Sequence, residues 1–481
     1  MAADTVKRVA VVGGGISGLS AAFYMERFAA ERGLALEITL IEGSRRLGGK
    51  IRTLRRDGCV IEQGPDSFLA RKTPIIELTR ELGLLDELAA LNPEAKRTFI
   101  LHKNRLHPLP EGLMLGVPTR LVPFMTTGLI SPLGKMRAAL DLILPRKKEE
   151  GDESLGAFLE RRLGREVHRR IAEPLLAGIY AGDTGALSLQ ATFPQFHAIE
   201  RRHRSLILGM MRSGRQQGAG GGSVLPEAVR DSAFLSYKQG LSALIEALDR
   251  QLVRARRILG QPVNGLAVSG DGYRLSLADG ESVGCDAVVL AVPNFEISRI
   301  LGHLLPEHRL IDIPYVSVAN VVLAYDAAEL NGKLTGSGFL APRGEGLSIT
   351  ACTWTSMKWP HTAPGHMALL RCYVGRAGDE APPDLSDEAL TERVKRDLLL
   401  TMGIGARPLF AEVTRWNKAM PQYTVGHPER IGRFRSALSA RLPGVLATGA
   451  GFQGVGLPDC IAQGKQAAEE TVRFLSEDRE V

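Results

Sequence analysis

Three apolar segments at the start of the chain have the lengths and spacings of a strand, a helix and a second strand. Residues 8–12 and 36–41 are short apolar runs rich in valine, isoleucine and leucine, as in buried strands. Between them, residues 19–25 carry apolar side chains at helical spacing. The order strand, helix, strand predicts a βαβ unit in which the two strands are parallel.

A glycine-rich turn joins the first predicted strand to the helix. It has the pattern G-x-G-x-x-G, and Glu42 ends the second strand 24 residues after Gly18. Glycines here let the backbone approach a pyrophosphate at the helix N-terminus, and the acid can bind ribose hydroxyls. The pattern predicts a dinucleotide site, although an ordinary strand-to-helix turn would also explain the glycines alone. The motif consists of Gly13, Gly14, Gly15, Ile16, Ser17 and Gly18.

The pattern then changes along the chain. A long region at about 65–212 has repeated helical periodicity, and residues 214–222 are predicted to form an exposed glycine-rich linker. A buried strand at 285–293 is of the kind that returns to the nucleotide sheet. Further periodic segments predict helices at 75–91, 134–144, 154–179 and 241–252, and strands at 262–266, 273–277, 316–324, 347–354 and 367–374.

The C-terminal segment repeats the strand, glycine turn and helix of the N-terminus. Residues 444–451 form an apolar run that ends in glycines, and a helix is predicted from Asp459. A plain strand-turn-helix is the alternative to a second cofactor-binding element. The β-rich segments between residues 300 and 405 predict a separate antiparallel sheet.

Composition narrows the class of protein. A chain of 481 residues with 44% hydrophobic and 23% charged residues predicts a soluble globular protein of two or three domains. No apolar run approaches the roughly 20 residues that span a bilayer, and we expect no signal peptide and a cytoplasmic location. The five cysteines lack C-x-x-C spacing, so neither a disulfide framework nor a metal site is expected.

The net charge of +7 indicates an anionic partner without identifying it. The basic residues are scattered in short clusters such as 201–204 and 254–257, which are typical of solvated helix faces. We therefore expect no nucleic acid partner. A substrate with several carboxylates or an anionic membrane surface would suit the charge equally well.

Other motifs resemble known flavoproteins. Residues 46–50, Arg-Leu-Gly-Gly-Lys, resemble the second signature of FAD-dependent oxidases of the amine-oxidase superfamily. A longer series resembles the oxygen-dependent porphyrinogen oxidases over nearly the whole chain. The series comprises residues 62–69, 178–183, 187–188, 192–194, 203–207, 415–416, 420–423, 426–427 and 454–460. The segments 351–355 and 358–361 resemble the Gram-positive form of that family, whose substrate is coproporphyrinogen III rather than protoporphyrinogen IX.

The resemblance implies an α/β fold: a Rossmann-type FAD-binding domain in discontinuous segments, an antiparallel-sheet substrate domain and a helical insertion. It implies FAD in residues 1–64, 230–300 and 406–481, a helical substrate- or membrane-facing domain at 65–212, and a β-rich substrate domain at 301–405.

The resemblance also implies the site residues. Outside the first glycine motif, the cofactor would contact Glu42, Gly43, Arg46, Gly49, Lys50, Gly64, Pro65, Asp66, Ser67, Val263, Trp416, Gly449, Val455, Gly456 and Leu457. The substrate would contact Arg71, Lys72, Gly178, Leu340 and Trp359, with Asp66 and Lys72 as the catalytic candidates. From the residues alone, Asp66 is equally well explained as a turn residue that caps the following helix.

The expected activity is the FAD-dependent oxidation of coproporphyrinogen III to coproporphyrin III in heme biosynthesis, with oxygen as acceptor and hydrogen peroxide as product. The alternatives are protoporphyrinogen IX oxidation, another flavin oxidase such as an amine oxidase or carotenoid desaturase, and a non-catalytic porphyrin carrier. The resemblance also implies a peripheral contact with a membrane or with another heme-pathway enzyme, and leaves monomer and homodimer open.

Overall fold

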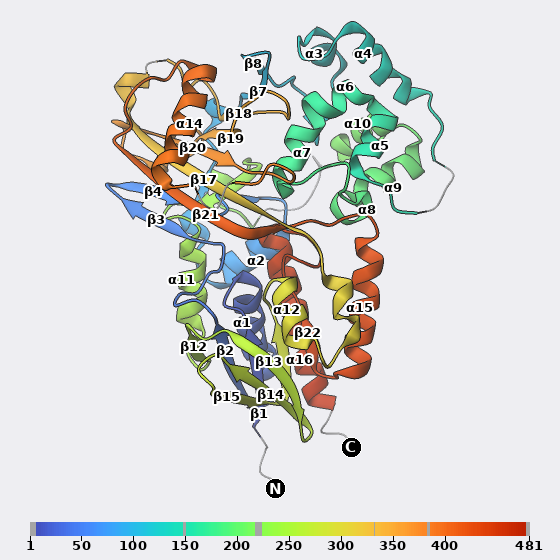
Figure 1. Cartoon of the computed structure of the whole chain (residues 1–481), viewed down its shortest axis with the longest axis vertical. Coiled ribbons are helices and arrows are strands. Elements are labelled where there is room, and N and C mark those ends of the chain that lie inside the picture. Colours follow the sequence, from blue (N-terminus) through green and yellow to red (C-terminus); the bar gives the residue numbers. More distant parts are fainter. Residues whose placement is uncertain (1–5, 148–150, 217–223, 331, 382–384, 478–481) are drawn as a thin grey trace.

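The computed structural model describes residues 6–147, 151–216, 224–330, 332–381 and 385–477. Its lower half in Figure 1 is built around a five-stranded parallel sheet in the order β12-β2-β1-β16-β22. The strands come from the beginning, the middle and the end of the chain, which confirms the predicted discontinuous α/β architecture. They are β1 (Lys7–Val12), β2 (Leu36–Glu42), β12 (Arg256–Leu259), β16 (Ala287–Leu290) and β22 (Val445–Ala447).

Both faces of the parallel sheet are covered. Along β1, Val9 and Val11 belong to one apolar core, whereas Ala10 and Val12 belong to another. This follows from the alternation of side chains along a strand, and it explains why a sheet strand buried on both faces has a continuous apolar sequence. The first core is shared with α1 (Ile16–Glu31), α2 (Thr73–Glu81), α11 (Ser242–Gln251) and α16 (Leu457–Glu477).

The second core lies under a small antiparallel sheet and two helices. The sheet consists of β13 (Val263–Ser269), β14 (Gly272–Leu277) and β15 (Ser282–Cys285), as the predicted hairpin arm indicated. The helices are α12 (Asn294–Leu301) and α15 (His427–Arg441).

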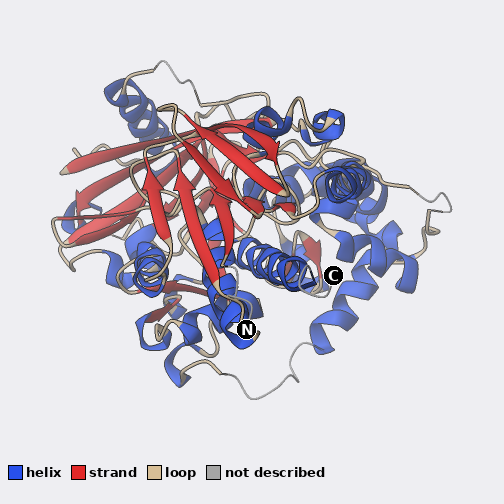
Figure 2. Ribbon diagram, turned by 90° about the horizontal axis from the view of Figure 1, so that it is seen from below, coloured by secondary structure: helices blue, strands red, loops and turns tan. Residues whose placement is uncertain are grey.

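A seven-stranded, mainly antiparallel sheet forms the upper left of Figure 1, and its long strands cross the left half of Figure 2. Strand β21 pairs with β17, although its residues fall in the segment predicted to complete the cofactor domain. The strands in order are β21 (Phe410–Pro421), β17 (Tyr315–Asp326), β20 (Met367–Val374), β19 (Ile349–Trp354), β18 (Gly338–Leu340), β7 (Thr98–His102) and β8 (Arg105–Pro108). Helix α14 (Asp387–Met402) contributes to the core beside this sheet.

The helical part lies at the upper right of Figure 1 and has a core of its own, formed around Leu155, Phe158 and Phe196. Its helices include α3 (Leu121–Thr126), α4 (Pro132–Ala139), α5 (Leu155–Leu163), α7 (Glu173–Tyr180), α8 (Leu189–Thr192), α9 (Pro194–His203) and α10 (Leu206–Gln216). No helix among the described residues is long and apolar enough to cross a membrane.

The region 65–212 differs from its prediction in containing strands. The periodicity of residues 75–91 yields only α2, because the chain turns at Gly83, whose φ of 70° suits glycine after a helix end. Six short strands lie within region 65–212. They are β5 (Phe68–Leu69), β6 (Leu88–Ala90), β7, β8, β9 (Leu113–Met114) and β10 (Val117–Pro118). Of the predicted linker at 214–222, residues 217–222 lie outside the described residues.

Candidate active site

A cavity of about 1570 Å³ lies where the cofactor sheet, the seven-stranded sheet and the helical part meet. Ligand pockets are typically about 300–1,000 Å³, so this cavity has room for two ligands side by side. Its lining combines the first glycine turn, the C-terminal glycine turn, strand β18 and helix α7.

The first glycine turn forms one end of the cavity. Helix α1 begins directly after Gly15, so its unpaired backbone N–H groups face the cavity with the positive end of the helix dipole. The Glu42 carboxylate accepts hydrogen bonds from the backbone N–H of Gly14 at 2.7 Å and of Ser44 at 2.8 Å. This end is therefore suited to a diphosphate with a ribose beside Glu42.

The glycines of this turn have different surroundings in the fold. A Cβ on Gly18 would lie 1.9 Å from the carbonyl oxygen of Gly13, so this glycine is required for helix–strand packing. Gly15 has an ordinary φ of −74°, and no atom of the described chain lies within 4 Å of a Cβ placed there. The protein itself gives no reason for a glycine at position 15. The open space at the helix N-terminus is what a bound diphosphate needs, and FAD fits these residues.

The second signature, residues 46–50, forms a loop that supports the cofactor side of the cavity. The Arg46 guanidinium donates to the backbone carbonyls of Leu47, Gly49 and Ile51 at 2.7–3.3 Å, so Arg46 holds the loop and lies outside the cavity lining. Gly49 and Lys50 line the cavity. The Lys50 ammonium donates to the carbonyl of Ala419, and burial lowers the pKa of Lys50.

Segments far apart in sequence complete the cofactor side. Trp416 donates from its indole Nε1 to the carbonyl of Gln63 at 2.7 Å, and a Cβ on Gly64 would lie 1.7 Å from the Lys50 carbonyl oxygen. The Val263 carbonyl accepts a hydrogen bond from Arg299 at 2.7 Å. The structure brings into one cavity the predicted residues Gly13, Gly15, Ile16, Ser17, Glu42, Gly43, Gly49, Lys50, Gly64, Pro65, Asp66, Ser67, Val263, Trp416, Gly449, Val455, Gly456 and Leu457. Gly14 and Gly18 lie behind this lining.

The opposite end of the cavity is apolar with cations on its wall. Leu340 and Gly178, two of the residues predicted to contact the substrate, line the cavity. Arg343 lies 3.0 Å from Glu173 and donates to the carbonyl of Gly182, whereas Arg376 donates to the carbonyl of Ala341 at 3.3 Å. Sequence reasoning missed Arg343 and Arg376, because loop arginines carry no spacing signal.

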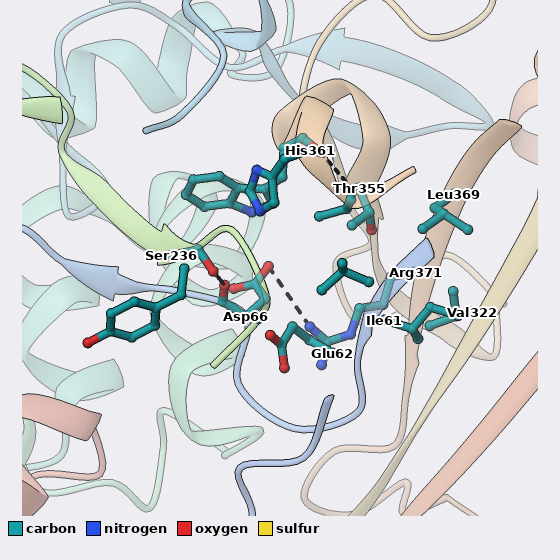
Figure 3. A pocket seen from close by; sticks show the side chains of 14 residues that line it. Ile61, Glu62, Asp66, Ser236, Val322, Thr355, His361, Leu369 and Arg371 are labelled. Atoms are coloured by element: carbon teal, nitrogen blue, oxygen red, sulfur yellow. Dashed lines mark hydrogen bonds and ion pairs between the residues drawn. The ribbon is translucent and has the colours of Figure 1, made fainter. Parts of the chain in front are cut away.

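Three predicted substrate residues lie outside this lining among the described residues: Arg71, Lys72 and Trp359. The Lys72 ammonium is 2.7 Å from Asp459, at the start of α16 beside the C-terminal glycine turn. Trp359 is only 1% exposed and lines a separate, water-sized cavity of about 10 Å³. Figure 3 shows this small cavity, with Asp66 and Arg371 on its wall.

Asp66 lines both cavities. Its Oδ1 accepts a hydrogen bond from Ser67 at 2.7 Å, and its Oδ2 lies 3.4 Å from the Lys358 ammonium and 3.9 Å from Arg371. Burial raises the pKa of Asp66, but Lys358 and then Arg371 outweigh burial and lower it to about 2. Helix α2 begins only at Thr73, so Asp66 is a half-buried, ionised carboxylate rather than a helix cap.

Sequence reasoning also missed Lys358 and Arg371. Lys358 stood in a recognised motif without a role, whereas Arg371 had a signal of its own. It is the one charged residue in the apolar strand β20, and a buried charge of this kind needs a partner.

Comparison with known proteins agrees with this geometry. The family model of the flavin-containing amine oxidoreductases matches residues 16–472. The chain is 45% identical to the coproporphyrinogen III oxidase of Bacillus subtilis, over 98% of this chain and 99% of the relative. It is 33% identical to the protoporphyrinogen oxidase of Bos taurus, over 96% of this chain and 98% of the relative.

A solved structure gives the same result. The putative protoporphyrinogen oxidase from Exiguobacterium sp. 255-15 has a TM-score of 0.86 and 37% identity, with 98% of this chain and 100% of that chain covered. The glycine cradle, the carboxylate beside it and the whole-length match agree on the cofactor and the class of enzyme. The chain belongs to the flavin-containing amine oxidoreductase family and is an FAD-dependent oxidoreductase.

Proposed function

We propose that this enzyme oxidises coproporphyrinogen III to coproporphyrin III, with oxygen as the electron acceptor and hydrogen peroxide as the product. The observation that carries the proposal is the cavity itself. One end has the glycine cradle for FAD, and the other has an apolar wall that carries Arg343 and Arg376. A porphyrinogen is an apolar ring with carboxylate substituents, and it needs this combination of surfaces.

The number of cations supports a substrate with four propionates over one with two. Besides Arg343 and Arg376, the lysines Lys96 and Lys358 line the cavity. Glu173 pairs with Arg343, Asp379 lies 3.8 Å from Arg376, and Asp66 lies 3.4 Å from Lys358. Lys96 and Arg371 also line the cavity, so positive charge remains in excess. Carboxylate substituents bind such groups through charge-assisted hydrogen bonds. The protoporphyrinogen oxidases among the relatives make protoporphyrinogen IX the second candidate substrate.

The chain's own residues supply binding and electrostatics. Bound FAD would supply the hydride acceptor for a methylene bridge of the substrate. The ionised Asp66 on the cavity wall would stabilise the positive charge that hydride loss leaves on the macrocycle. Because its pKa is about 2, Asp66 accepts a hydrogen bond from a pyrrole N–H at neutral pH and is not a proton donor.

The test supplies the purified flavoprotein with each porphyrinogen and follows porphyrin fluorescence, oxygen consumption and peroxide. We expect all three signals, with a higher kcat/KM for coproporphyrinogen. A preference for protoporphyrinogen would overturn the substrate assignment. Anaerobic addition of porphyrinogen should bleach the flavin absorption, whereas a non-catalytic carrier would leave it intact. Peroxide release with amines alone would favour an amine oxidase.

Arg376 provides a sharper test of the tetracarboxylate substrate. Arg376→Gln removes a cation from the wall and should lower kcat/KM for coproporphyrinogen by about tenfold or more, the equivalent of one charge-assisted hydrogen bond. The loss should be smaller for protoporphyrinogen. Arg274→Gln, on the exposed surface of β14, is the matched control. Equal losses for both substrates would contradict this role for Arg376.

Lys72 stays a proposed contact at the rim of the cavity. Its partner Asp459 lies against Gly456, which lines the cavity. Lys72→Ala should raise KM by about tenfold if a propionate displaces Asp459 as the partner of the ammonium. Unchanged kcat and KM would remove Lys72 from the site. Lys395→Ala on α14, whose ammonium also pairs with a carboxylate (Glu392), controls for loss of a paired lysine.

A further inference from the structure

Arg371 occupies the partition between the large cavity and the small one. It stands on β20, is 3% exposed, and lines both cavities. Its Nη2 donates to the carbonyl of Gly64, and its guanidinium lies 4.8 Å from the centre of the Tyr373 ring. Figure 3 shows its side chain extended toward Asp66, with a dashed line joining the two residues. Arg371 therefore contacts the same short segment, residues 64–66, that faces the cofactor end of the cavity.

The contact with Asp66 is long. Arg371 Nη1 lies 3.9 Å from Asp66 Oδ2, which is an ion-pair distance and too long for a hydrogen bond. Neither Nη1 nor Nε has a hydrogen-bond partner among the described residues. An ionised carboxylate has about four acceptor positions, and of these the structure uses one on Oδ1 for Ser67 and one on Oδ2 for Lys358. Arg371 thus contributes charge near Asp66 without taking up an acceptor position.

We propose that Arg371 is a positioning residue that fixes the Gly64–Asp66 segment and keeps Asp66 ionised, so that its free acceptor positions can bind the substrate. This inference rests on the proposed function for the identity of the substrate. Without nearby cations, a buried carboxylate takes up a proton instead of remaining charged. A protonated Asp66 could neither stabilise positive charge on the macrocycle nor accept two N–H bonds.

Other groups also face Asp66 and share in its charge balance. Lys358 comes from the short helix α13 (Thr355–Lys358), and Glu62 from strand β4 (Cys59–Glu62). His361 lines the small cavity, and Tyr373 lies beside Arg371 on β20. Burial lowers the pKa of His361, whereas burial raises that of Glu62 to about 7. Arg371 lowers the pKa of both carboxyl groups, and its removal leaves Asp66 with Lys358 as its cation. We therefore expect Asp66 to take up a proton at a higher pH without Arg371.

The test compares Arg371→Gln with Arg371→Lys, which keeps the positive charge. In wild type and Arg371→Lys, Asp66 should stay ionised between about pH 5 and 9. Protonation of Asp66 should therefore cause no fall in kcat at the acid end of this range. Arg371→Gln should show a new acid limb in this range, with kcat lowered about tenfold at its acid end and KM changed less than about twofold. An Arg371→Gln profile that matches wild type would overturn the proposal.

Two further variants identify the group that titrates. The acid limb of Arg371→Gln should vanish when Asp66→Asn is added and persist when Glu62→Gln is added. The reverse result would assign the limb to Glu62 and overturn the proposal. If Arg371→Gln does not retain FAD, Arg371→Lys carries the test alone, because an acid limb in this charge-conserving variant would also contradict the inference.

A measurement that needs no catalytic turnover tests the role of Arg371 independently of the proposed function. The absorption spectrum of the bound flavin is recorded against pH, without substrate, in wild type and each variant. We expect a spectral transition in Arg371→Gln that Asp66→Asn abolishes and wild type lacks. If wild type oxidises no porphyrinogen, the proposed function fails while this transition still tests Arg371. If turnover is normal but the transition is absent, Arg371 alone loses its assigned role.

Discussion

At the scale of single residues, the site depends on what glycines and buried charges permit. The sequence predicted the glycine motif. It could not show why a glycine stands at each position, because that depends on the atoms that surround the position in the fold. Gly18 faces the Gly13 carbonyl, whereas Gly15 faces open space. The ionisation of Asp66 could not be predicted either, since Lys358 and Arg371 lie about 300 residues away in the sequence. A charge inside an apolar strand was the available signal for Arg371.

The two glycines give a paired prediction. Gly15→Ala should leave the thermal unfolding of the FAD-free protein unchanged and weaken FAD binding by about tenfold or more, because its Cβ occupies only the cofactor's space. Gly18→Ala should also destabilise the FAD-free protein by about 1–3 kcal/mol through overpacking. Differential scanning fluorimetry and flavin titration measure both effects. Equal destabilisation of the FAD-free protein by the two variants would contradict the distinction.

Glu62 gives a prediction about pH. Burial raises its pKa from 4.5 to about 7, so the folded state binds its proton more tightly than the unfolded state does. The stability associated with this proton is present below about pH 4.5 and is lost as pH rises through about 7. Glu62→Gln, which still accepts from Leu241 N–H, should therefore raise the melting temperature more at pH 8 than at pH 5. The 80%-exposed Glu111→Gln serves as control, and a shift independent of pH would count against this ionisation.

At the scale of elements, helices and strands with a clear hydrophobic periodicity could be predicted from the sequence. The elements that each of them pairs with or packs against were harder to predict. The strands predicted at 316–324 and 367–374 lie within β17 and β20, and the strand predicted at 347–354 starts two residues before β19. By contrast, β21 mixes polar and apolar residues without a regular alternation, and its pairing with β17 depends on contacts across about a hundred residues. The short strands β7 and β8 were missed because helical periodicity surrounds them. Local pattern gives the type of an element, whereas long-range packing decides which layer it joins.

The helical part contains a buried charge cluster that its sequence did not reveal. Arg162 on α5 donates to Asp141 at 2.6 Å and lies 3.5 Å from Glu200 on α9, and Asp141 also accepts from the backbone N–H of Ile207 at 2.9 Å. The cluster therefore links four helical segments, the turn Leu140–Leu142 and helices α5, α9 and α10, in a region where Arg162 and Asp141 are fully buried.

Breaking this cluster should destabilise the helical part strongly. Arg162→Met leaves the fully buried Asp141 without its cation, whereas Glu200 keeps its ion pair with Arg161. The substitution should cost about 3–5 kcal/mol, measured by urea unfolding. The exposed ion pair of Arg120 with Glu111 is the control, since Arg120→Met should cost less than about 1 kcal/mol. Comparable losses from the two substitutions would show that the buried cluster is not specially stabilising.

At the scale of the whole molecule, the cofactor site is assembled from both ends and the middle of the chain. Residues from β1, β4, β13, β21 and α16 or the loops beside them line one cavity. The discontinuous fold was predictable because each piece carries a motif. The size of the cavity and the cations opposite the glycine turn were not, because they arise only when the two sheets and the helical part meet.

FAD should therefore stabilise the molecule as a unit. A ligand that binds only the folded state adds about 2.7 kcal/mol at one hundred times its Kd, and the cavity that FAD fits is lined by segments from all parts of the chain. We expect the melting temperature of the FAD-free protein to rise steadily with added FAD, in one transition that includes the helical part. A separate transition for the helical part, insensitive to FAD, would contradict this coupling.

The order of strands in the parallel sheet also has a consequence during synthesis. Strand β16 pairs on one edge with β1, and its other neighbour, β22, begins 155 residues after β16 ends. At about 5–20 residues per second, a ribosome takes roughly 8–30 s to supply that neighbour. During this interval the nascent polypeptide carries an apolar strand with an open edge, the kind of surface that aggregates and that chaperones bind. Because the turn after β22 and the start of α16 are translated after the rest of the cavity lining, the nucleotide can be enclosed only late in synthesis.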